Sequence, residues 1–391
     1  MLNFTLYSPT RYEFGRGVET KAGEIIASLG GRRVLVVYGG GSAIRTGVMD
    51  RVLQSLTEAR LDHQLLGGAQ PNPRSGMVYD GVALAREMVA DFVLAVGGGS
   101  AIDTAKAIAL GARYAGDFWD LFAGTAKPSA ALPVGVVLTM AAAGSEGSAS
   151  AVITREADNL KRGLGTEFNR PRFALLNPEL TFTVSPYQTA CGVTDIMAHV
   201  IERYLTNERE VDLTDRLCEA VLQAVIKAAP AAIERPDDYD ARSQIMWAGT
   251  LAHNDWVGSG RQGDWSSHQI EHELSALYDV PHGAGLAVVL PAFMRCQLSH
   301  DVMRFAQFAV RVWGCQMDFE RPERTAIEGV ERFEQFLRGI GMPITLKELG
   351  AKSEDIPALA GKVRRTNGDK VGFFSPLDDA GVEAVLRAAD R

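Results

Sequence analysis

The chain has 391 residues, more than one ordinary hydrophobic core accommodates, so we expect two domains. Hydrophobic residues make up 46% and charged residues 23%, as in soluble globular proteins. A net charge of −8 without a dense Lys/Arg cluster argues against nucleic-acid binding, and no apolar run has membrane-spanning length. There is no signal-peptide pattern, and the 4 cysteines lack CxxC spacing, which favours reduced thiols and a cytoplasmic location.

The first half of the chain alternates short apolar runs with helical stretches. Residues 34–37, 92–96 and 134–138 are continuous apolar runs, each followed by glycine or by a helical pattern. Such runs predict parallel strands that are buried on both faces. Residues 48–60 and 76–90 carry helical periodicity between them, so the rhythm is that of a doubly wound α/β sheet.

One glycine-rich turn, Gly97-Gly-Gly-Ser100, directly follows a predicted strand and opens a helix. Glycines there let the backbone approach a bound group closely, and free N–H groups at the helix start suit a pyrophosphate. The turn is not a G-x-G-x-x-G fingerprint, so an ordinary Rossmann fold is not supported. A role in packing alone remains an alternative for this turn.

A second turn, Gly39-Gly-Gly-Ser42, follows the strand that would carry the selector for the adenosine ribose. NAD enzymes usually place an Asp or Glu there, which hydrogen-bonds the ribose 2′-OH and repels a 2′-phosphate. In this chain no acid occurs before Asp50, whereas Ser42 and Arg45 can donate to a phosphate. The turn therefore predicts NADP(H) in preference to NAD(H).

The character of the chain changes after Pro186, where the loop-like segment 177–186 ends. Helices with few intervening strands are then predicted over residues 187–233, 237–258, 264–278 and 299–315. We expect an α/β dinucleotide-binding domain over residues 1–186 and an all-α metal-binding and substrate domain over residues 187–391. Since the glycine turns lie in the first domain and the histidines described next in the second, chemistry between the two domains is the natural expectation.

The helical half concentrates histidines at helical spacing. Asp195 and His199 share one helical face, His268 and His272 repeat the four-residue spacing, and His282 follows ten residues later. One carboxylate and three imidazoles form a divalent metal site of mixed oxygen and nitrogen ligands, suited to Fe(II) or Zn(II). A surface pair for Asp195 and His199, and a packing or supporting role for His272, stay open as alternatives.

The remaining histidines, His63, His253 and His300, have no such partner pattern and are expected to be ordinary. Glu202 is expected to brace the helix that carries Asp195 and His199 rather than to react. Glu271 lies next to the second histidine pair and is given no step in the chemistry.

Together these features resemble the iron-activated (group III) alcohol dehydrogenases, most closely their NADPH-dependent aldehyde reductase and butanol dehydrogenase branch. The similarity begins near Tyr7 and fades after Pro291. Its markers are Pro71-Asn-Pro73, the segment from Gly97 to Lys106, Gly144-Ser-Glu146, Asp195-x3-His199-x2-Glu202 and His268-x3-His272-x9-His282-Gly283.

The resemblance implies a homodimer whose chains have an N-terminal α/β nucleotide domain and a C-terminal helical domain, as in dehydroquinate synthase. It implies that Asp195, His199, His268 and His282 hold the metal, with Fe(II) as the native ion and Zn(II) as a substitute. It implies that His272 lies near the nicotinamide and substrate. Cofactor contacts are implied for a set of residues in the first domain, namely Gly39, Gly40, Ser42, Asn72, Gly98, Gly99, Ser100, Asp103, Thr139, Ser148, Lys161 and Thr183.

Two positions depart from the family pattern. Ala143 stands where Thr is common before Gly-Ser-Glu, which removes a hydroxyl near the phosphates, and Ser148 stands where Asn is frequent. Neither position touches the metal. The departures therefore bear on cofactor affinity more than on the type of reaction.

The expected reaction is hydride transfer between NADP(H) and an aldehyde or primary alcohol. The metal would polarise the carbonyl oxygen, and the reduced nicotinamide would deliver the hydride. His272 is the one catalytic side chain that we name, as a proton relay, because imidazole titrates near neutrality. The sequence leaves the particular substrate and the physiological direction open.

Two other interpretations stay open. A lyase of the dehydroquinate synthase type would use NAD and zinc, but it needs a pocket rich in Lys and Arg. Around the metal ligands the sequence supplies mainly Arg203, Arg261 and Arg295, which is few for such a pocket. A non-catalytic nucleotide- and metal-binding module would keep the ligands without turnover.

Overall fold

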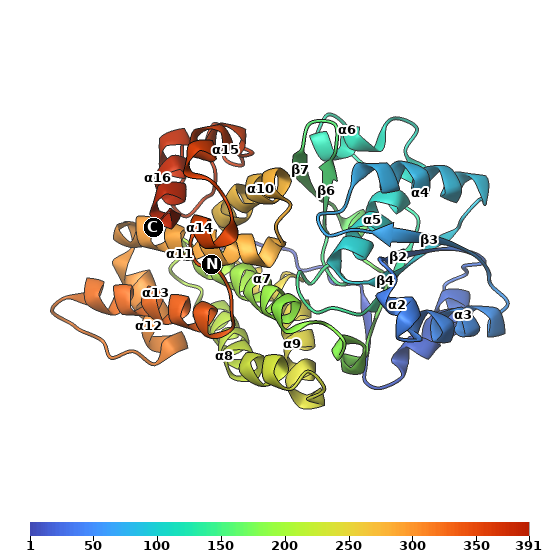
Figure 1. The fold of residues 1–391 in the computed structure, drawn as a ribbon, viewed down its shortest axis with the longest axis horizontal. Coiled ribbons are helices and arrows are strands. Elements are labelled where there is room, and N and C mark those ends of the chain that lie inside the picture. Colours follow the sequence, from blue (N-terminus) through green and yellow to red (C-terminus); the bar gives the residue numbers. More distant parts are fainter. Residues whose placement is uncertain (391) are drawn as a thin grey trace. The chain divides into compact units, whose positions relative to one another are not determined.

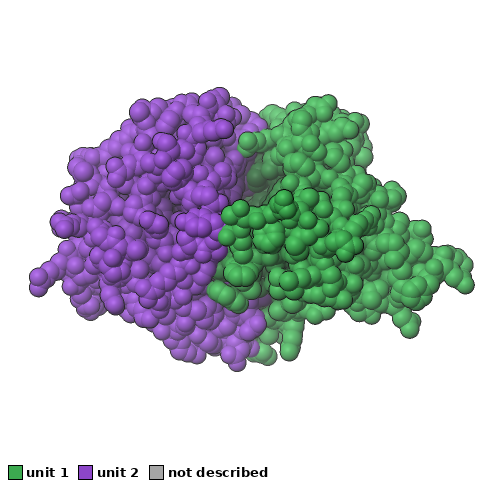
Figure 2. All heavy atoms as spheres, turned by 180° about the vertical axis from the view of Figure 1, so that it is seen from behind, with its two compact units in different colours: residues 1–6, 185–236, 247–391 green, residues 7–184, 237–246 purple. Residues whose placement is uncertain are grey.

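The structure is a computed structural model that describes residues 1–390, and its chain forms two compact units. The α/β unit comprises residues 7–184 together with 237–246. The helical unit comprises residues 1–6, 185–236 and the chain from residue 247 onward. Figure 1 labels the elements, and Figure 2 colours the α/β unit purple and the helical unit green.

The α/β unit is built on a six-stranded sheet in which every neighbouring pair is parallel. In spatial order the strands are β1 (Arg11–Phe14), β8 (Phe173–Leu176), β5 (Val134–Leu138), β4 (Phe92–Gly97), β2 (Arg33–Gly39) and β3 (Asp62–Ala69). From β2 the chain passes outward to β3 and then returns to β4 on the other side of β2. The carboxyl ends of β2 and β4 therefore meet at a switch point of the sheet, where open α/β sheets bind ligands.

Both faces of this sheet are covered by helices, which explains the continuous apolar runs (Figure 1). On one face Leu35 and Val93 join a core formed with α4 (Ser75–Glu87), α5 (Gly99–Arg113) and α6 (Phe118–Ala123). On the other face Val36 and Leu94 join a core formed with α1 (Ala22–Ser28) and α3 (Val48–Glu58). Successive strand residues thus alternate between two buried faces, as strand geometry requires.

The sequence analysis did not predict four of the strand features of this unit. These are β1, β3, β8 and the antiparallel hairpin of β6 (Ser150–Arg155) and β7 (Leu160–Gly165). The strands β1 and β3 lie at the two edges of the sheet, and β3 is largely exposed, so neither forms a continuous apolar run. The strand β8 is fully buried but has only 4 residues, too few for a distinct pattern.

The helical unit contains α7 (Pro186–Tyr204) and α8 (Asp212–Glu234), separated by a connection where one continuous helical stretch was predicted. The further helices are α9 (Tyr239–Ala252), whose first residues belong to the α/β unit, α10 (Ser266–Tyr278), α11 (His282–Gln297), α12 (Val302–Trp313), α13 (Pro322–Gly339), α14 (Leu346–Leu349), α15 (Ile356–Lys362) and α16 (Asp379–Ala389). The short helix α2 (Ser42–Arg45) and six 3-10 turns complete the described chain: η1 (Val18–Lys21), η2 (Glu167–Asn169), η3 (Pro178–Thr181), η4 (Trp256–Gly258), η5 (Leu298–His300) and η6 (Ser353–Asp355).

The helix α11 lies at the centre of the helical unit and packs against α7, α10, α13 and α16. Its residues 283–294 are all buried, so it is apolar around its whole circumference. A helix of this kind shows no amphipathic periodicity, which explains why the sequence did not predict it. Among residues 1–390, no helix combines the length and hydropathy needed to cross a membrane.

Candidate metal centre

The predicted metal ligands lie on three helices of the helical unit. Asp195 and His199 are on α7, His268 is on α10, and His282 is the first residue of α11. Ser185 is the N-cap of α7, and its side chain accepts a hydrogen bond from the Gln188 N–H. A serine in this position followed by proline is a strong helix start, so the local sequence itself determines where α7 begins.

Asp195, His268 and His282 converge although they come from three different helices. Their potential ligand atoms all lie within 4.8 Å of one another. Asp195 Oδ1 lies 3.8 Å from His268 Nε2 and 3.8 Å from His282 Nε2. Asp195 and His268 are buried, whereas the His282 side chain is 25% exposed. The three side chains therefore form a compact group that opens on one side.

Two atoms of this group are buried without a hydrogen bond. Asp195 Oδ1 and His268 Nε2 make no hydrogen bond to any part of the described chain. Leaving a buried polar atom unsatisfied costs about 1–3 kcal/mol, more for a charged group, so such atoms call for another partner. A divalent cation bound by a carboxylate oxygen and imidazole nitrogens would supply it, and this donor set suits Fe(II) or Zn(II).

The fourth predicted ligand, His199, lies beside this group but is not one of its three members. His199 Nδ1 lies 3.1 Å from Asp195 Oδ1 and forms a hydrogen bond of 2.8 Å with the Asp195 carbonyl oxygen. Its ring centroid is 4.5 Å from that of His268. The structure thus brings three of the predicted ligands together and leaves the ligation by His199 a prediction.

The charges around Asp195 keep it in the carboxylate form that a metal requires. Burial alone would raise the pKa of Asp195, but the neighbouring His199 and His268 imidazoles hold that pKa well below its usual range. Burial likewise would lower the pKa of His268, but Glu202 and Asp195 raise it to about 9. The negative potential of the group therefore attracts positive charge, which is the condition for binding a cation.

Each of two ligand histidines contacts a buried glutamate with its other ring nitrogen. His268 Nδ1 is hydrogen-bonded to Glu202 Oε2, and His282 Nδ1 is hydrogen-bonded to Glu271 Oε2. The sequence analysis gave Glu202 only a bracing role and Glu271 none. A signal was present in the sequence, because each glutamate follows a histidine by three residues, as His199-x2-Glu202 and His268-x2-Glu271.

His272, the predicted proton relay, is buried on α10. Its ring centroid lies 5.6 Å from that of His282, and its ring atoms come close to Glu271 and His282. It is not a member of the group around Asp195. Its role as a proton relay stays a prediction.

His253, which was expected to be ordinary, has its ring centroid 4.1 Å from that of His199, with the two rings tilted by 35°. The Trp265 ring lies close to the same histidines, with its centroid 5.3 Å from that of His268. The Arg203 guanidinium lies over the Trp265 ring, 4.4 Å from its centroid. No spacing in the sequence links His253 to the other histidines, so only the folded chain reveals this contact.

In the α/β unit, the two glycine turns follow the adjacent strands β2 and β4. Gly39 ends β2, Gly40 follows it, and Ser42 opens α2, while Gly98, Gly99 and Ser100 lie at the start of α5. Because the two strand ends are neighbours in the sheet, the turns lie at its switch point. This is the arrangement expected for residues that bind one dinucleotide.

The predicted cofactor residue Asp103 has both carboxylate oxygens engaged within the unit. It accepts hydrogen bonds from Ser145 Oγ at 2.5 Å and from the Val152 N–H at 2.9 Å. Lys106, fully buried one turn later, donates to Ser145 Oγ and to the Ser148 carbonyl oxygen, and burial lowers its pKa to about 8. Both side chains therefore tie α5 to the loop 144–150.

The other predicted cofactor residues have varied surroundings. Lys161 donates to Asn72 Oδ1 at 3.0 Å, and both residues are buried. Thr139 follows β5, with its N–H bonded to the Gly97 carbonyl oxygen. Ser148 is buried, whereas Thr183 is exposed. Their contacts with a cofactor stay a prediction.

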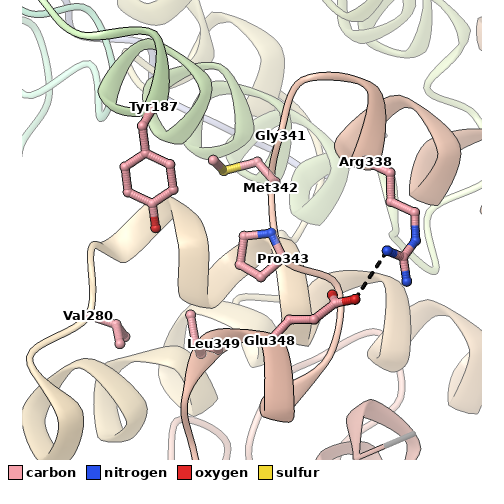
Figure 3. Close-up of a pocket in the computed structure, with 8 residues that line it drawn as sticks. All are labelled: Tyr187, Val280, Arg338, Gly341, Met342, Pro343, Glu348 and Leu349. Carbon is pink, nitrogen blue, oxygen red and sulfur yellow. Dashed lines mark hydrogen bonds and ion pairs between the residues drawn. The ribbon is translucent and has the colours of Figure 1, made fainter.

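A pocket of about 440 Å³ opens in the helical unit beside the start of α7 (Figure 3). One wall carries Tyr187, and an ion pair between Arg338 and Glu348 closes another side. The remaining lining is formed by Val280, Gly341, Met342, Pro343 and Leu349. None of the predicted metal or cofactor residues lines this pocket, so it does not identify the substrate site.

Comparison with known proteins defines the class to which this fold and this site belong. The family model described as iron-containing alcohol dehydrogenase matches residues 9–178, and the C-terminal model of the Fe-containing alcohol dehydrogenase family matches residues 189–389. The chain therefore belongs to the iron-containing alcohol dehydrogenase family. The resemblance noted in the sequence is confirmed, but it does not fade after Pro291, because the match continues to residue 389.

Individual relatives cover the whole chain. The chain is 41% identical over 389 residues to the probable NADH-dependent butanol dehydrogenase 1 of Bacillus subtilis, with 100% of both chains covered. It is 37% identical to the NADPH-dependent aldehyde reductase YqhD of Escherichia coli, with 95% of both covered. The crystal structure of NADH-dependent butanol dehydrogenase A from Thermotoga maritima matches with a TM-score of 0.97 and 36% identity, covering 100% of this chain and 99% of that one. The predicted fold class is confirmed.

Proposed function

We propose that the protein is a metal-dependent oxidoreductase that transfers hydride between NADP(H) and an aldehyde or primary alcohol. The observation that carries the proposal is the convergence of Asp195, His268 and His282 from three helices, with two buried ligand atoms left for a cation. The relatives support the substrate class, since they are named butanol dehydrogenases and an aldehyde reductase.

In this proposal Asp195, His268 and His282 hold the ion, and His199 is the fourth ligand. A bound Fe(II) or Zn(II) supplies Lewis acidity toward a carbonyl oxygen. The protein contributes the carboxylate charge of Asp195 and the fixed orientation of the histidine rings. The Trp265 ring lies beside the rings of His199 and His268.

We assign to His272 the transfer of a proton to or from the substrate oxygen. Its burial beside His282, outside the group around Asp195, supports a role in proton transfer rather than in ligation. An imidazole can hold a proton and release it near neutral pH, which a relay requires.

The preference for NADP(H) rests on the turn after β2. No acid stands between Gly39 and Asp50, and the exposed Ser42 and Arg45 can donate hydrogen bonds to a 2′-phosphate. The related butanol dehydrogenases are named NADH-dependent and the related aldehyde reductase NADPH-dependent, so the family admits both cofactors. We base the proposed preference for NADP(H) on the side chains of this turn.

A homodimer is part of the proposal. The N-terminal residues Met1, Leu2 and Phe4 are 54%, 44% and 54% exposed, a large apolar area for a short segment. Packing against a second copy of the chain would bury it. Light scattering of the purified protein should give twice the mass of one chain. We further propose a cytoplasmic location, supported by four cysteines that form no disulfide.

The decisive experiment is an NAD(P)H oxidation assay with short aldehydes, using enzyme reconstituted with Fe(II) or Zn(II). We expect aldehyde-dependent oxidation with a higher kcat/KM for NADPH than for NADH. No oxidation with either cofactor would overturn the proposed activity and would favour a lyase or a binding module. A preference for NADH would overturn only the cofactor assignment.

A further inference from the structure

Two glutamates in the helical unit form a repeated pattern around the metal centre. Glu202 on α7 contacts His268 on α10, and Glu271 on α10 contacts His282 on α11. Both glutamate side chains are completely buried. Two of the three helices, α7 and α10, therefore each supply a carboxylate that contacts the histidine of the next helix.

The atoms in these contacts determine which ring nitrogen faces the ion. In both histidines Nδ1 faces the glutamate, while Nε2 lies 3.8 Å from Asp195 Oδ1. A carboxylate is only an acceptor, so Nδ1 must carry the hydrogen. The lone pair of a neutral ring then lies on Nε2, the nitrogen that a cation at Asp195 would meet.

We propose that Glu202 and Glu271 are the positioning residues of the metal centre, which fix the tautomer and the ring orientation of His268 and His282. This inference rests on the metal site of the proposed function. Neither glutamate touches the ion in this assignment. They act through the histidines, by holding Nδ1–H so that Nε2 is available as a ligand.

The close approach of Glu271, His272 and His282 could instead suggest a second ion position. The contacts of Glu271 argue against it. Its Oε2 is hydrogen-bonded to His282 Nδ1, and its Oε1 accepts from the Ser275 hydroxyl. A Cβ added to Gly285 would lie 2.7 Å from the same Oε1, so the carboxylate is tightly enclosed. It is a support for His282 and not a free ligand.

The two glutamates differ in their second partner, and this difference makes the proposal testable. Glu202 Oε1 accepts from the backbone N–H of Ser267 at 2.6 Å, and a backbone N–H can only donate. Glu271 Oε1 accepts from the Ser275 hydroxyl, which can rotate to donate or accept. A glutamine, with one acceptor and one donor end, therefore fits the surroundings of Glu271 but not those of Glu202.

In Glu202→Gln, the amide NH₂ must face either Ser267 N–H or His268 Nδ1. If it faces His268, Nδ1 becomes the acceptor and the hydrogen moves to Nε2, where it blocks the metal. If it faces Ser267, a buried donor at the start of α10 loses its acceptor. In Glu271→Gln the Ser275 hydroxyl accepts from the NH₂, and His282 keeps its Nδ1–H and its ligand nitrogen.

The experiment measures the dissociation constant of Zn(II) by competition with a chromophoric chelator, using purified full-length protein. We expect Glu202→Gln to weaken binding about 10–100-fold, as supporting partners of metal ligands generally do. Glu271→Gln should remain close to the wild type. The matched control is Glu219→Gln, a buried glutamate of α8 that is hydrogen-bonded to Tyr204 and contacts no ligand histidine. Its Zn(II) affinity should be unchanged.

Equal weakening in Glu202→Gln and Glu271→Gln would overturn the tautomer assignment, because loss of charge alone would then explain both. Unchanged affinity together with unchanged folding stability in Glu202→Gln would overturn it as well, because the variant must lose either the ligand nitrogen of His268 or the hydrogen bond of the Ser267 N–H. If circular dichroism shows that Glu202→Gln does not fold, the Zn(II) affinity of Glu271→Leu tests the proposal instead. It removes the acceptor without replacing it, so we expect weakened Zn(II) binding, and wild-type affinity would refute the inference. Wild-type protein that binds no divalent metal would instead refute the proposed function.

Discussion

The proposed metal centre depends on individual polar atoms that are buried and therefore have no water as a partner. Asp195 Oδ1 and His268 Nε2 face each other with no hydrogen bond, whereas the other nitrogen of His268 is held by Glu202. In water each of these groups would be satisfied by solvent. Inside the fold neither atom makes a hydrogen bond to the residues that the structure describes, and a bound cation would satisfy both, so these atoms are the most direct argument for a metal.

Substitution of the histidines of α10 should separate metal binding from proton transfer. His268→Ala should lose metal and activity together, because it removes a ligand. His272→Ala should keep its metal and lower kcat about 10²–10⁴-fold, the effect of losing a proton-transfer group. Metal content by mass spectrometry and steady-state kinetics test this. An empty site in His272→Ala would show that His272 is itself a ligand, and His300→Ala serves as a control.

Asp264 should make the stability of the protein depend on pH. Burial, reinforced by the charge of Glu202, raises the pKa of Asp264 from 3.8 to about 6. The folded state therefore binds this proton more tightly than the unfolded state, and the resulting stability is present below pH 4 and is lost as the pH rises through 6. A shift of this size corresponds to about 3 kcal/mol.

Urea denaturation of metal-free wild type and Asp264→Asn at several pH values would measure the effect. The stability of the wild type relative to the variant should decrease from pH 4 to pH 7. The Asn oxygen can still accept from the Phe373 and Phe374 N–H groups, but its NH₂ cannot accept from the Ser266 N–H as Asp264 Oδ2 does, so the variant loses this one hydrogen bond at every pH. A difference in stability that does not change with pH would contradict the raised pKa.

At the scale of elements, the metal centre depends on how closely three helices approach one another. α11 passes α7 at Gly283, where an added Cβ would lie 2.0 Å from the Cys191 carbonyl oxygen. This glycine directly follows His282, a proposed ligand, and Cys191 lies one turn before Asp195, another proposed ligand. The contact between the helices therefore sets the separation between two of the ligands.

Gly283→Ala should push α11 away from α7, because the atom that it would meet is backbone and cannot rotate away. We expect a loss of about 1–3 kcal/mol in the free energy of unfolding, as for other overpacked sites, together with weaker metal binding. Denaturant titration and chelator competition would measure the two effects. The control is Gly361→Ala in α15, where no atom lies within 4 Å and alanine should be neutral or stabilising. Wild-type stability in Gly283→Ala would contradict the close approach.

At the scale of the whole molecule, two units with separate cores carry separate parts of the proposed activity. The parallel sheet presents the glycine turns, and the helical unit holds the proposed metal ligands. A ligand that binds only the folded state stabilises the unit that holds it. We therefore expect the metal to stabilise the helical unit and the cofactor to stabilise the α/β unit.

Removal of the metal should lower the thermal stability of the helical unit in particular. A cation bound by α7, α10 and α11 links three helices, and at 1,000 times its dissociation constant it would contribute about 4 kcal/mol. Differential scanning calorimetry with and without chelator should show a lower transition temperature for the helical unit, while NADPH should raise that of the α/β unit. A chelator effect confined to the α/β unit would contradict the location of the site.

The regular elements were predictable to the extent that burial leaves a pattern in the sequence. The strands β2, β4 and β5 were found because each lies between two helical layers and is apolar throughout. The helix α11 was missed because it is buried on all sides and has no polar face. The edge strand β3 was missed because its exposure removes the apolar run. Short apolar runs thus identify buried strands, whereas a helix without a polar face and an exposed edge strand leave no recognisable pattern.

The sequence by itself determined the α/β fold of the first half, the family and the types of side chain in the metal centre, because these follow from local periodicity and from short motifs. The tertiary structure alone decided the pairings that cross between helices. Glu202 contacts His268, Glu271 contacts His282, and the ring of His253 lies beside that of His199. Helix spacing relates residues three or four positions apart, whereas these contacts depend on how α7, α10 and α11 pack, which no local pattern encodes.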